Sequence, residues 1–337
     1  MSYLLIGDLH LTDRPRDAYR FDIFKWIKQQ QEKYKVTTTF LLGDITNEKD
    51  RHSATLVNNL IDNLKGLKPP VFICKGNHDY TSPDNPFFGF LNWLDGIIFV
   101  SNPGVYFCGD LKIAILPHCR EEKLVQMNCE AFADEGKIDL LLCHNTFQGA
   151  IAETGAPLTG FSAAPIEALK PRLGCYAGDV HRPQKAGPVT YVGAPYHVRL
   201  GDDFDPRCIL LEENGKAIDL YFEAPRKWKV NVTGAYDILK NKNLIKGDHI
   251  KVTIELAREE AVEWQTYKQQ VLDACAEIGL EVFGVDLKVL GNSRHSNTSV
   301  TVANQPVNII EAFCKSESTS SQVREAGLAC LNSTAST

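Results

Sequence analysis

The stretch Val71–Asp79, with the sequence VFICKGNHD, joins a short apolar run to a polar Gly-Asn-His-Asp turn. A brief apolar run bounded by turn residues is consistent with a buried strand. Two earlier runs, Tyr3–Ile6 and Thr39–Leu42, are each followed by Gly-Asp, and apolar residues at helical spacing lie after them over 21–27 and 56–64. Alternating strands and helices predict an α/β fold with a parallel or mixed sheet covered by helices.

Two later apolar runs end in the same kind of residue. Ile138–Cys143 leads into a histidine, and Cys175–Ala177 leads into Gly-Asp-Val-His. Because ligand sites in open α/β sheets lie at the carboxyl ends of the strands, we expect these polar turns to meet at one rim. The side chains expected there are Asp8, His10, Asp44, Asn77, His78, Asp79, His144, Asp179 and His181.

This donor set indicates a site for divalent cations. Carboxylates, imidazoles and an amide oxygen suit Mn²⁺, Fe²⁺ or Zn²⁺, and the lack of thiolates argues against a structural zinc site. Asp8 and His10 can bind one ion together, and the Asp44 carboxylate can bridge two ions roughly 3.5–4 Å apart. Such a pair binds and polarises a phosphate ester and acidifies a water molecule. We expect glycines to allow a sharp backbone turn at the strand ends, at Gly7, Gly43, Gly76 and Gly178.

Composition limits the remaining possibilities. The chain of 337 residues is 44% hydrophobic and 23% charged, which is typical of a globular protein. Its net charge of -6 excludes a global basic field for nucleic acid and leaves a local basic patch or bound metal. The first residues have no basic n-region and only a short apolar run, so we expect no signal peptide, and no apolar stretch in the sequence reaches membrane-spanning length. The ten cysteines form no CxxC pair, so we expect reduced thiols and a cytoplasmic protein, in the host cytoplasm if the chain is viral.

The pattern changes near residues 224–226. Beyond this point, alternating residues over 250–254 and 283–289 predict strands, and an apolar stripe over 264–278 predicts a helix. Strand, helix and strand of this size predict a small α+β domain with one covered sheet face. We therefore divide the chain into a main domain (1–225), a small α+β domain (226–290) and a C-terminal tail (291–337).

The ordered motifs resemble those of a known family. Asp-x-His, Gly-Asp, Gly-Asn-His-Asp, a single His and Gly-x-x-His follow one another as in the calcineurin-like metallophosphoesterases. Within them, the run Tyr191–Pro195 is similar to the Gly-Ser/Ala-Pro segment of the SbcD-type exonuclease subunits of double-strand-break repair and their phage relatives. The resemblance implies a four-layer αββα sandwich in the main domain. It also implies that the small domain caps DNA.

The resemblance further implies a role for each motif residue. It implies two divalent metal ions, with Mn²⁺ expected and Mg²⁺, Fe²⁺ or Zn²⁺ as alternatives. The first ion would be held by Asp8, His10, Asp44 and His181. The second would be held by Asp44, Asn77, His144 and Asp179. His78 would stand beside the scissile phosphate and stabilise the pentavalent state or protonate the leaving 3′ oxygen.

The chain departs from the family at one position. Asp179 occupies the place of the first histidine in the usual Gly-His-x-His motif. An aspartate there can still bind a metal, but it adds negative charge. We expect tighter cation binding and a less electrophilic metal pair.

By this resemblance, the chain would be a metal-dependent DNA phosphodiesterase, with exonuclease and endonuclease activity. It would act as a homodimer with an SbcC-type coiled-coil ATPase, and the tail 291–337 would be a docking segment. Basic residues after the first two motifs would hold DNA phosphates, although a solvated face explains them equally well. They are Arg14, Arg16, Arg20, Lys49 and Arg51.

Two alternatives remain at this point. The chain could be a different calcineurin-like phosphoesterase, such as a protein phosphatase or a cyclic-nucleotide phosphodiesterase. It could also be a DNA- or ATPase-binding scaffold in which Asp179 has weakened the second metal site.

Overall fold

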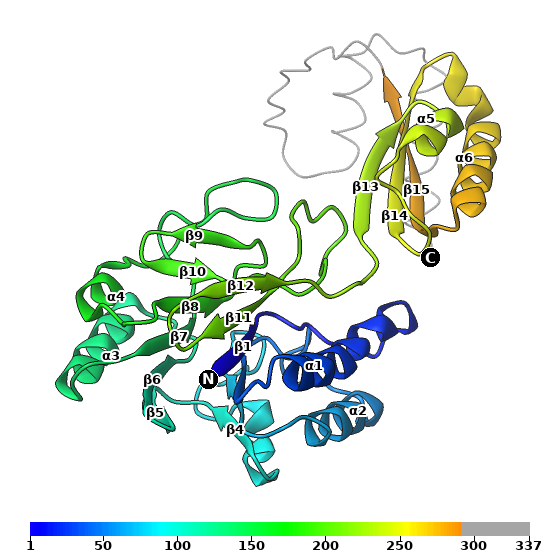
Figure 1. Cartoon of the computed structure of the whole chain (residues 1–337). Coiled ribbons are helices and arrows are strands. Elements are labelled where there is room, and N and C mark those ends of the chain that lie inside the picture. The colour runs from blue at the N-terminus through cyan, green and yellow to red at the C-terminus, as the bar shows by residue number, and fades with distance from the viewer. Residues whose placement is uncertain (291–337) are drawn as a thin grey trace, which may run out of the picture. The chain divides into compact units, whose positions relative to one another are not determined.

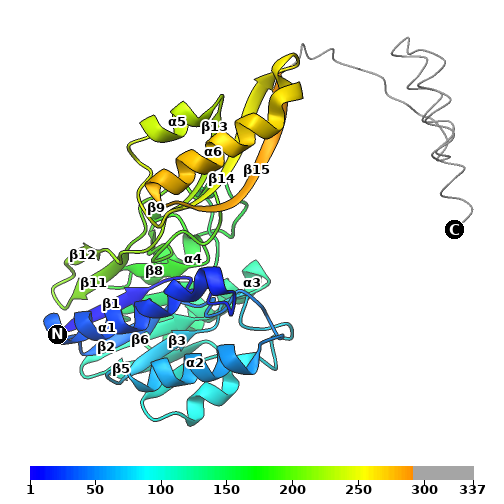
Figure 2. The same cartoon turned by 90° about the vertical axis from the view of Figure 1, so that its right-hand side faces the viewer.

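The computed structural model describes residues 1–290, and Figures 1 and 2 show their arrangement from two sides. The predicted docking tail, 291–337, lies outside the described residues. Within residues 1–290, no helix combines the length and the apolar composition that a membrane crossing requires.

The first sheet has six strands in the order β12-β11-β1-β2-β3-β4. The strands β1 to β4 pair in parallel, whereas β11 and β12 are antiparallel additions beside β1. The bounds are β1 (Ser2–Ile6), β2 (Thr38–Leu41), β3 (Val71–Cys74), β4 (Ile97–Val100), β11 (Cys208–Glu212) and β12 (Ala217–Leu220).

The second sheet also has six strands, in the order β5-β6-β7-β8-β10-β9. Its four inner strands pair in parallel, and β5 and β9 are antiparallel edges. The bounds are β5 (Gly104–Cys108), β6 (Leu111–Leu116), β7 (Leu140–His144), β8 (Cys175–Gly178), β9 (Gln184–Ala186) and β10 (Val189–Tyr191).

The two sheets and their helices form four layers, which confirms the predicted αββα sandwich. In β1, Tyr3 and Leu5 pack into the core between the sheets, whereas Leu4 and Ile6 pack against the helices. Both faces of the strand are therefore buried, which explains its uninterrupted apolar run. The first sheet is covered by α1 (Asp22–Lys33), α2 (Ala54–Lys65), η1 (Pro15–Phe21) and η2 (Phe87–Trp93), and the second by α3 (Glu122–Asp134) and α4 (Ala164–Leu169).

The chain changes sheets between β4 and β5. The sequence pattern predicts two strands over 97–116, but the structure has three, because Ser101-Asn102-Pro103 separates β4 in the first sheet from β5 in the second. Proline lacks a backbone N–H and cannot continue a ladder, so a strand ends before it.

Residues 227–290 form a three-stranded sheet with helices on one face, which we call the three-stranded layer. The strand order is β13-β14-β15, and β13 runs parallel to β14. Ile250, Val252 and Ile254 of β14 pack with Val271 and Cys275 of α6. The elements are β13 (Lys227–Val232), α5 (Ala235–Lys240), β14 (His249–Ala257), η3 (Glu260–Glu263), α6 (Trp264–Ile278) and β15 (Glu281–Leu290). The division of the chain at residues 225 and 290 stays a prediction.

Candidate metal centre

The predicted ligand residues meet where the carboxyl ends of β1, β2, β3, β7 and β8 approach one another. Three of these strands belong to the first sheet and two to the second. The residues that the structure brings together are Asp8, His10, Asp44, Asn77, His78, His144, Asp179 and His181. The two sheets thus build one centre from segments that are far apart in the sequence.

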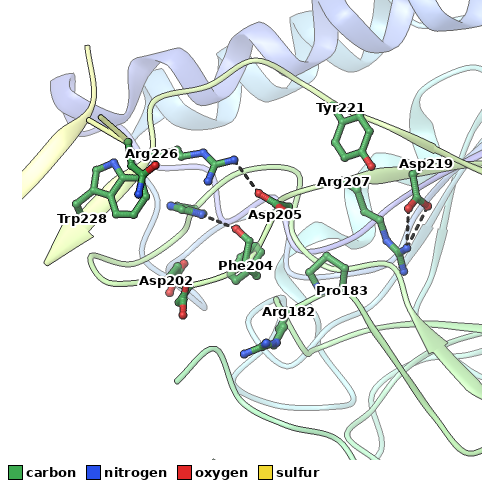
Figure 3. Close-up of a pocket in the computed structure, with 13 residues that line it drawn as sticks. Arg182, Pro183, Asp202, Phe204, Asp205, Arg207, Asp219, Tyr221, Arg226 and Trp228 are labelled. Atoms are coloured by element: carbon green, nitrogen blue, oxygen red, sulfur yellow. Dashed lines mark hydrogen bonds and ion pairs between the residues drawn. The ribbon is translucent and has the colours of Figure 1, made fainter. Parts of the chain in front are cut away.

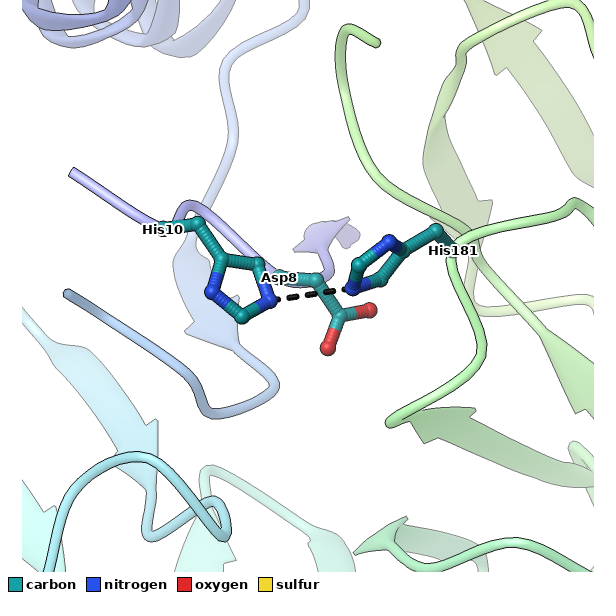
Figure 4. Close-up of side chains that lie close together, drawn as sticks. All are labelled: Asp8, His10 and His181. Carbon is teal, nitrogen blue, oxygen red and sulfur yellow. Dashed lines mark hydrogen bonds between the residues drawn. The ribbon is translucent and has the colours of Figure 1, made fainter. Parts of the chain in front are cut away.

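The first cluster consists of Asp8, His10 and His181 (Figure 4). One ligand atom of each lies within 4.8 Å of the others, and the Nε2 atoms of the two histidines are 3.0 Å apart. All three side chains are buried. Asp8 Oδ1 accepts a hydrogen bond from the backbone N–H of Asp179, while Asp8 Oδ2 has no hydrogen-bond partner within the described part of the chain.

Asp44 joins this cluster to a second one. Its Oδ2 lies 3.4 Å from Nε2 of His10, and its Oδ1 lies 3.3 Å from Nε2 of His144. The Oδ1 atoms of Asn77 and Asp179 lie 3.2 Å and 3.7 Å from the same His144 nitrogen. Each oxygen of Asp44 therefore faces a different imidazole, which is the geometry of a bridging carboxylate.

Further side chains orient the candidate ligands. His144 Nδ1 donates to the Leu42 carbonyl at 2.5 Å, which directs the Nε2 lone pair into the centre. Thr146 Oγ1 donates to Asp179 Oδ2, and Glu153 Oε1 lies 3.2 Å from His181 Nδ1. Thr146 and Glu153 could not be predicted from the sequence, because neither belongs to a motif and only folding brings them to the centre.

Asp79 organises the turns beneath the ligands. Its buried carboxylate accepts hydrogen bonds from the backbone N–H groups of Asp44, Ile45 and Gly76. These contacts tie the turn after β2 to the turn after β3. Asp79 is therefore a positioning residue of the centre.

The backbone is strained at the candidate ligands. Asp8, His10, Asp44 and Asp179 have positive φ values of 40°, 43°, 51° and 80°. Such conformations are uncommon for residues other than glycine and cost roughly 1–3 kcal/mol each, so the surrounding structure must impose them. Strain of this kind concentrates at functional sites.

The glycines beside the ligands serve two purposes. Gly43 has a φ of 96°, as a sharp turn requires, but Gly7, Gly76 and Gly178 lack such positive φ values, contrary to our expectation. At Gly76, a Cβ atom would collide with Asp44, because the two turns pack backbone to backbone. Three of the four glycines are therefore needed for space rather than for backbone freedom.

Burial and mutual charge set the protonation of the centre. Burial raises the pKa of Asp8 to about 8, against the opposing effect of His144. Burial also favours a higher pKa for Asp44, but His144 and His10 outweigh it and hold that pKa below its usual range. Burial lowers the pKa of His10. For His144, burial acts in the same direction, but Asp44 outweighs it and raises the pKa.

These residues fit two divalent cations. The buried Asp8 Oδ2 has no hydrogen-bond partner within residues 1–290, and the Nε2 atoms of His10 and His181 approach each other to 3.0 Å. A buried carboxylate oxygen without a donor is costly unless a positive charge neutralises it, and carboxylate oxygens and imidazole nitrogens are both ligands of divalent cations. When bound, the cations would supply charge neutralisation for a phosphate and acidification of a water molecule.

His78 lies beside both clusters. Its backbone N–H donates to Asp44 Oδ1, its Nδ1 lies 2.7 Å from the Asn47 carbonyl oxygen, and its ring packs edge-on against His10. If Nδ1 donates to that carbonyl, Nε2 is the nitrogen left for a substrate oxygen.

The predicted basic residues do not share one environment. Arg14, Arg16, Lys49 and Arg51 are exposed, and Arg16 forms a 3.4 Å ion pair with Glu281 of β15. Arg20 is only 2% exposed, and its guanidinium donates to backbone carbonyls inside the protein. The proposed DNA contact of Arg20 is therefore wrong, since a buried guanidinium with protein partners cannot reach a phosphate.

A cavity of about 840 Å³ is lined by Arg182, the residue after the candidate ligand His181 (Figure 3). None of the candidate ligands lines this cavity. Two of its arginines are already paired. Arg207 binds Asp219 through two 3.0 Å hydrogen bonds, and Arg226 binds Asp205 at 2.8 Å. The cavity therefore offers little free positive charge to a phosphate.

A sandwich of two sheets with a carboxylate and imidazole cluster at the strand ends defines a metal-dependent hydrolase of phosphoesters. The family model for the calcineurin-like phosphoesterases matches residues 1–183, which is more than half of the chain. The chain therefore belongs to the calcineurin-like phosphoesterase family.

Solved structures that match part of the chain include an archaeal phosphodiesterase and Vps29 of Chaetomium thermophilum. The first is 14% identical, with a TM-score of 0.36 over 65% of this chain and 100% of that chain. The second is 18% identical, with a TM-score of 0.30 over 66% of this chain and 100% of that chain. A search of curated proteins found no match. The family assignment rests on the match over residues 1–183.

Proposed function

We propose that the chain is a metal-dependent DNA phosphodiesterase, the nuclease subunit of an SbcCD-like repair or recombination complex. The position of Asp44 carries the proposal, because one of its oxygens faces His10 and the other faces His144. A pair of cations sharing one carboxylate suits hydrolysis of a phosphate ester by in-line attack of water.

The proposed ligand sets follow the two clusters. Asp8, His10, Asp44 and His181 hold one ion. Asp44, Asn77, His144 and Asp179 hold the other. His78, with Nδ1 beside the Asn47 carbonyl, would stabilise the pentavalent state through Nε2 or, as an imidazolium, give its Nε2 proton to the leaving 3′ oxygen. We favour Mn²⁺ on the resemblance to the SbcD-type nucleases, since the donor set alone suits Mn²⁺, Fe²⁺ and Zn²⁺.

DNA as the substrate is supported by two features beside the centre. Arg14, Lys49 and Arg51 are exposed in the segments that follow the first two ligand turns, where they can hold backbone phosphates. Arg16 is exposed as well but is paired with Glu281. The three-stranded layer follows the sandwich and contacts the first of these segments through Arg16 and Glu281. We also propose that the chain forms a homodimer and binds an SbcC-type ATPase. This part of the proposal depends on the resemblance of residues 191–195 to the SbcD-type nucleases.

A substrate panel tests the proposal. With Mn²⁺, we expect cleavage of linear duplex, plasmid or hairpin DNA and little turnover of a cyclic nucleotide or a phosphopeptide. An Asp44→Asn variant serves as the inactive control, which reports any cleavage by a contaminating nuclease. Turnover of the phosphopeptide alone would contradict the nuclease assignment and favour a protein phosphatase. One bound Mn²⁺ or none per chain, with no turnover, would favour a scaffold.

Asp179→His should raise Mn²⁺-dependent turnover several-fold. A neutral imidazole in place of a carboxylate leaves more positive charge on the cation pair, so the phosphate is more strongly polarised. The measurement is kcat on linear DNA at saturating Mn²⁺, with Asp50→His, an exposed position, as the control. Equal turnover in Asp179→His and the wild type would show that the charge at this position does not limit the rate.

A further inference from the structure

The strained turn Asp8-Leu9-His10 is held from behind by two buried side chains. The Tyr196 hydroxyl donates to the Leu9 carbonyl, and the Arg20 guanidinium donates to the His10 carbonyl. Both side chains are at most 2% exposed. Because Asp8 and His10 have positive φ values, these hydrogen bonds oppose relaxation of the turn to an ordinary conformation.

Arg20 is itself fixed on several sides. Its Nη2 donates to the Val198 carbonyl at 3.0 Å and lies 3.1 Å from Asp17 Oδ1. The guanidinium also stands over the Tyr196 ring, 5.4 Å from its centroid. A planar guanidinium with several donors can bind a carboxylate and two carbonyls at once, which an ammonium group cannot reproduce.

The contact continues into the three-stranded layer through Lys227, the first residue of β13. Lys227 Nζ lies 2.6 Å from Asp17 Oδ1, and the side chain is buried. The backbone N–H of Lys227 donates to His197 Nδ1 at 3.0 Å. Asp17 thus lies between two buried cations, and removing one partner from such a group leaves an unbalanced charge.

We propose that Arg20 is a positioning residue of the metal centre. Through the His10 carbonyl, it keeps the Asp8–His10 turn in its metal-binding conformation. Asp17 and Lys227 hold Arg20 in place and make the three-stranded layer part of that support. The inference rests on the proposed function for its metal centre, and none of the three residues touches a metal or the substrate.

Calorimetric titration of the full chain with Mn²⁺ alone tests the inference. Arg20→Met should weaken Mn²⁺ binding by about 10- to 100-fold, as loss of support behind a ligand does. Lys227→Met should weaken it in the same direction by a smaller factor, and Arg20→Lys should fall between Arg20→Met and the wild type. Arg172→Met is the control, because Arg172 also binds a carboxylate and a backbone carbonyl, those of Asp139 and Glu213, and Asp139 lies at the opposite end of β7 from His144.

Thermal unfolding of the metal-free variants separates positioning from stability. A variant that loses stability but binds Mn²⁺ like the wild type would overturn the inference and leave Arg20 a structural residue. If Arg20→Met does not fold, the Lys227→Met variant decides. An Mn²⁺ affinity in Lys227→Met equal to that of the wild type would then overturn the inference.

Failure of the proposed function has a different outcome. A wild type that binds two Mn²⁺ ions but cleaves no DNA would contradict the nuclease proposal alone. A wild type that binds no Mn²⁺ would overturn both. The expected result is weaker Mn²⁺ binding in Arg20→Met and Lys227→Met with the Arg172→Met control unchanged. It supports the inference whichever phosphoester proves to be the substrate.

Discussion

Asp44→Asn is expected to reduce DNA cleavage by roughly 1,000-fold, through loss of charge at the shared position of both cations. One oxygen of Asp44 faces His10 and the other faces His144. A neutral amide offers only one oxygen and no charge, so both ions should weaken together. The backbone N–H of His78, which donates to Asp44 Oδ1, can still donate to the new amide oxygen.

Bound Mn²⁺ per chain, measured by mass spectrometry after gel filtration, and cleavage rate together test this prediction. Asp50→Asn, at an exposed position, controls for the loss of one negative charge. Retention of one ion at full occupancy in Asp44→Asn would argue against a bridging carboxylate.

His78→Ala is expected to keep both cations and to lose about 10²- to 10⁴-fold in cleavage rate, the range of a lost acid–base group. Its Nδ1 lies at the Asn47 carbonyl rather than in the ligand clusters. Single-turnover cleavage of linear DNA at saturating Mn²⁺ measures the chemical step without product release.

The metal content of the same variant supplies the second half of the test. His10, Asp44 and His78 are close enough to hold an ion together. Loss of one Mn²⁺ in His78→Ala would therefore make His78 a ligand and remove its assignment as the group beside the leaving oxygen.

Most of the centre could be predicted from the sequence because each ligand turn directly follows an apolar strand. The run before Gly7-Asp8 and the run before His144 are uninterrupted because both faces of these strands are buried. Within each sheet the carboxyl ends of parallel strands share one edge, so the polar residues after them lie close together. That the two edges meet depends on how the two sheets pack.

The burial of Arg20 could not be predicted from the sequence. In the sequence it stands in a polar segment with Arg14 and Arg16, which is typical of a solvated face. Its burial depends on Tyr196, Val198 and Lys227, which only the folded chain brings near it. Side chains that support a site through long-range contacts carry no local signal, and this also explains why Glu153 was missed.

Short helices and strands could not be predicted from the sequence for a different reason. The strand β13 begins one residue after the predicted boundary and α5 has six residues, too few for a periodic pattern to stand out. The split of 97–116 between two sheets depends on the long-range pairing of β4 with β3 and of β6 with β7.

Anomalous scattering from a crystal soaked in manganese tests the central claim most directly. We predict two manganese peaks roughly 3.5–4 Å apart, with Asp44 bound to both, Asp8, His10 and His181 on one side, and Asn77, His144 and Asp179 on the other. A single peak, or two peaks without a shared Asp44, would contradict the account.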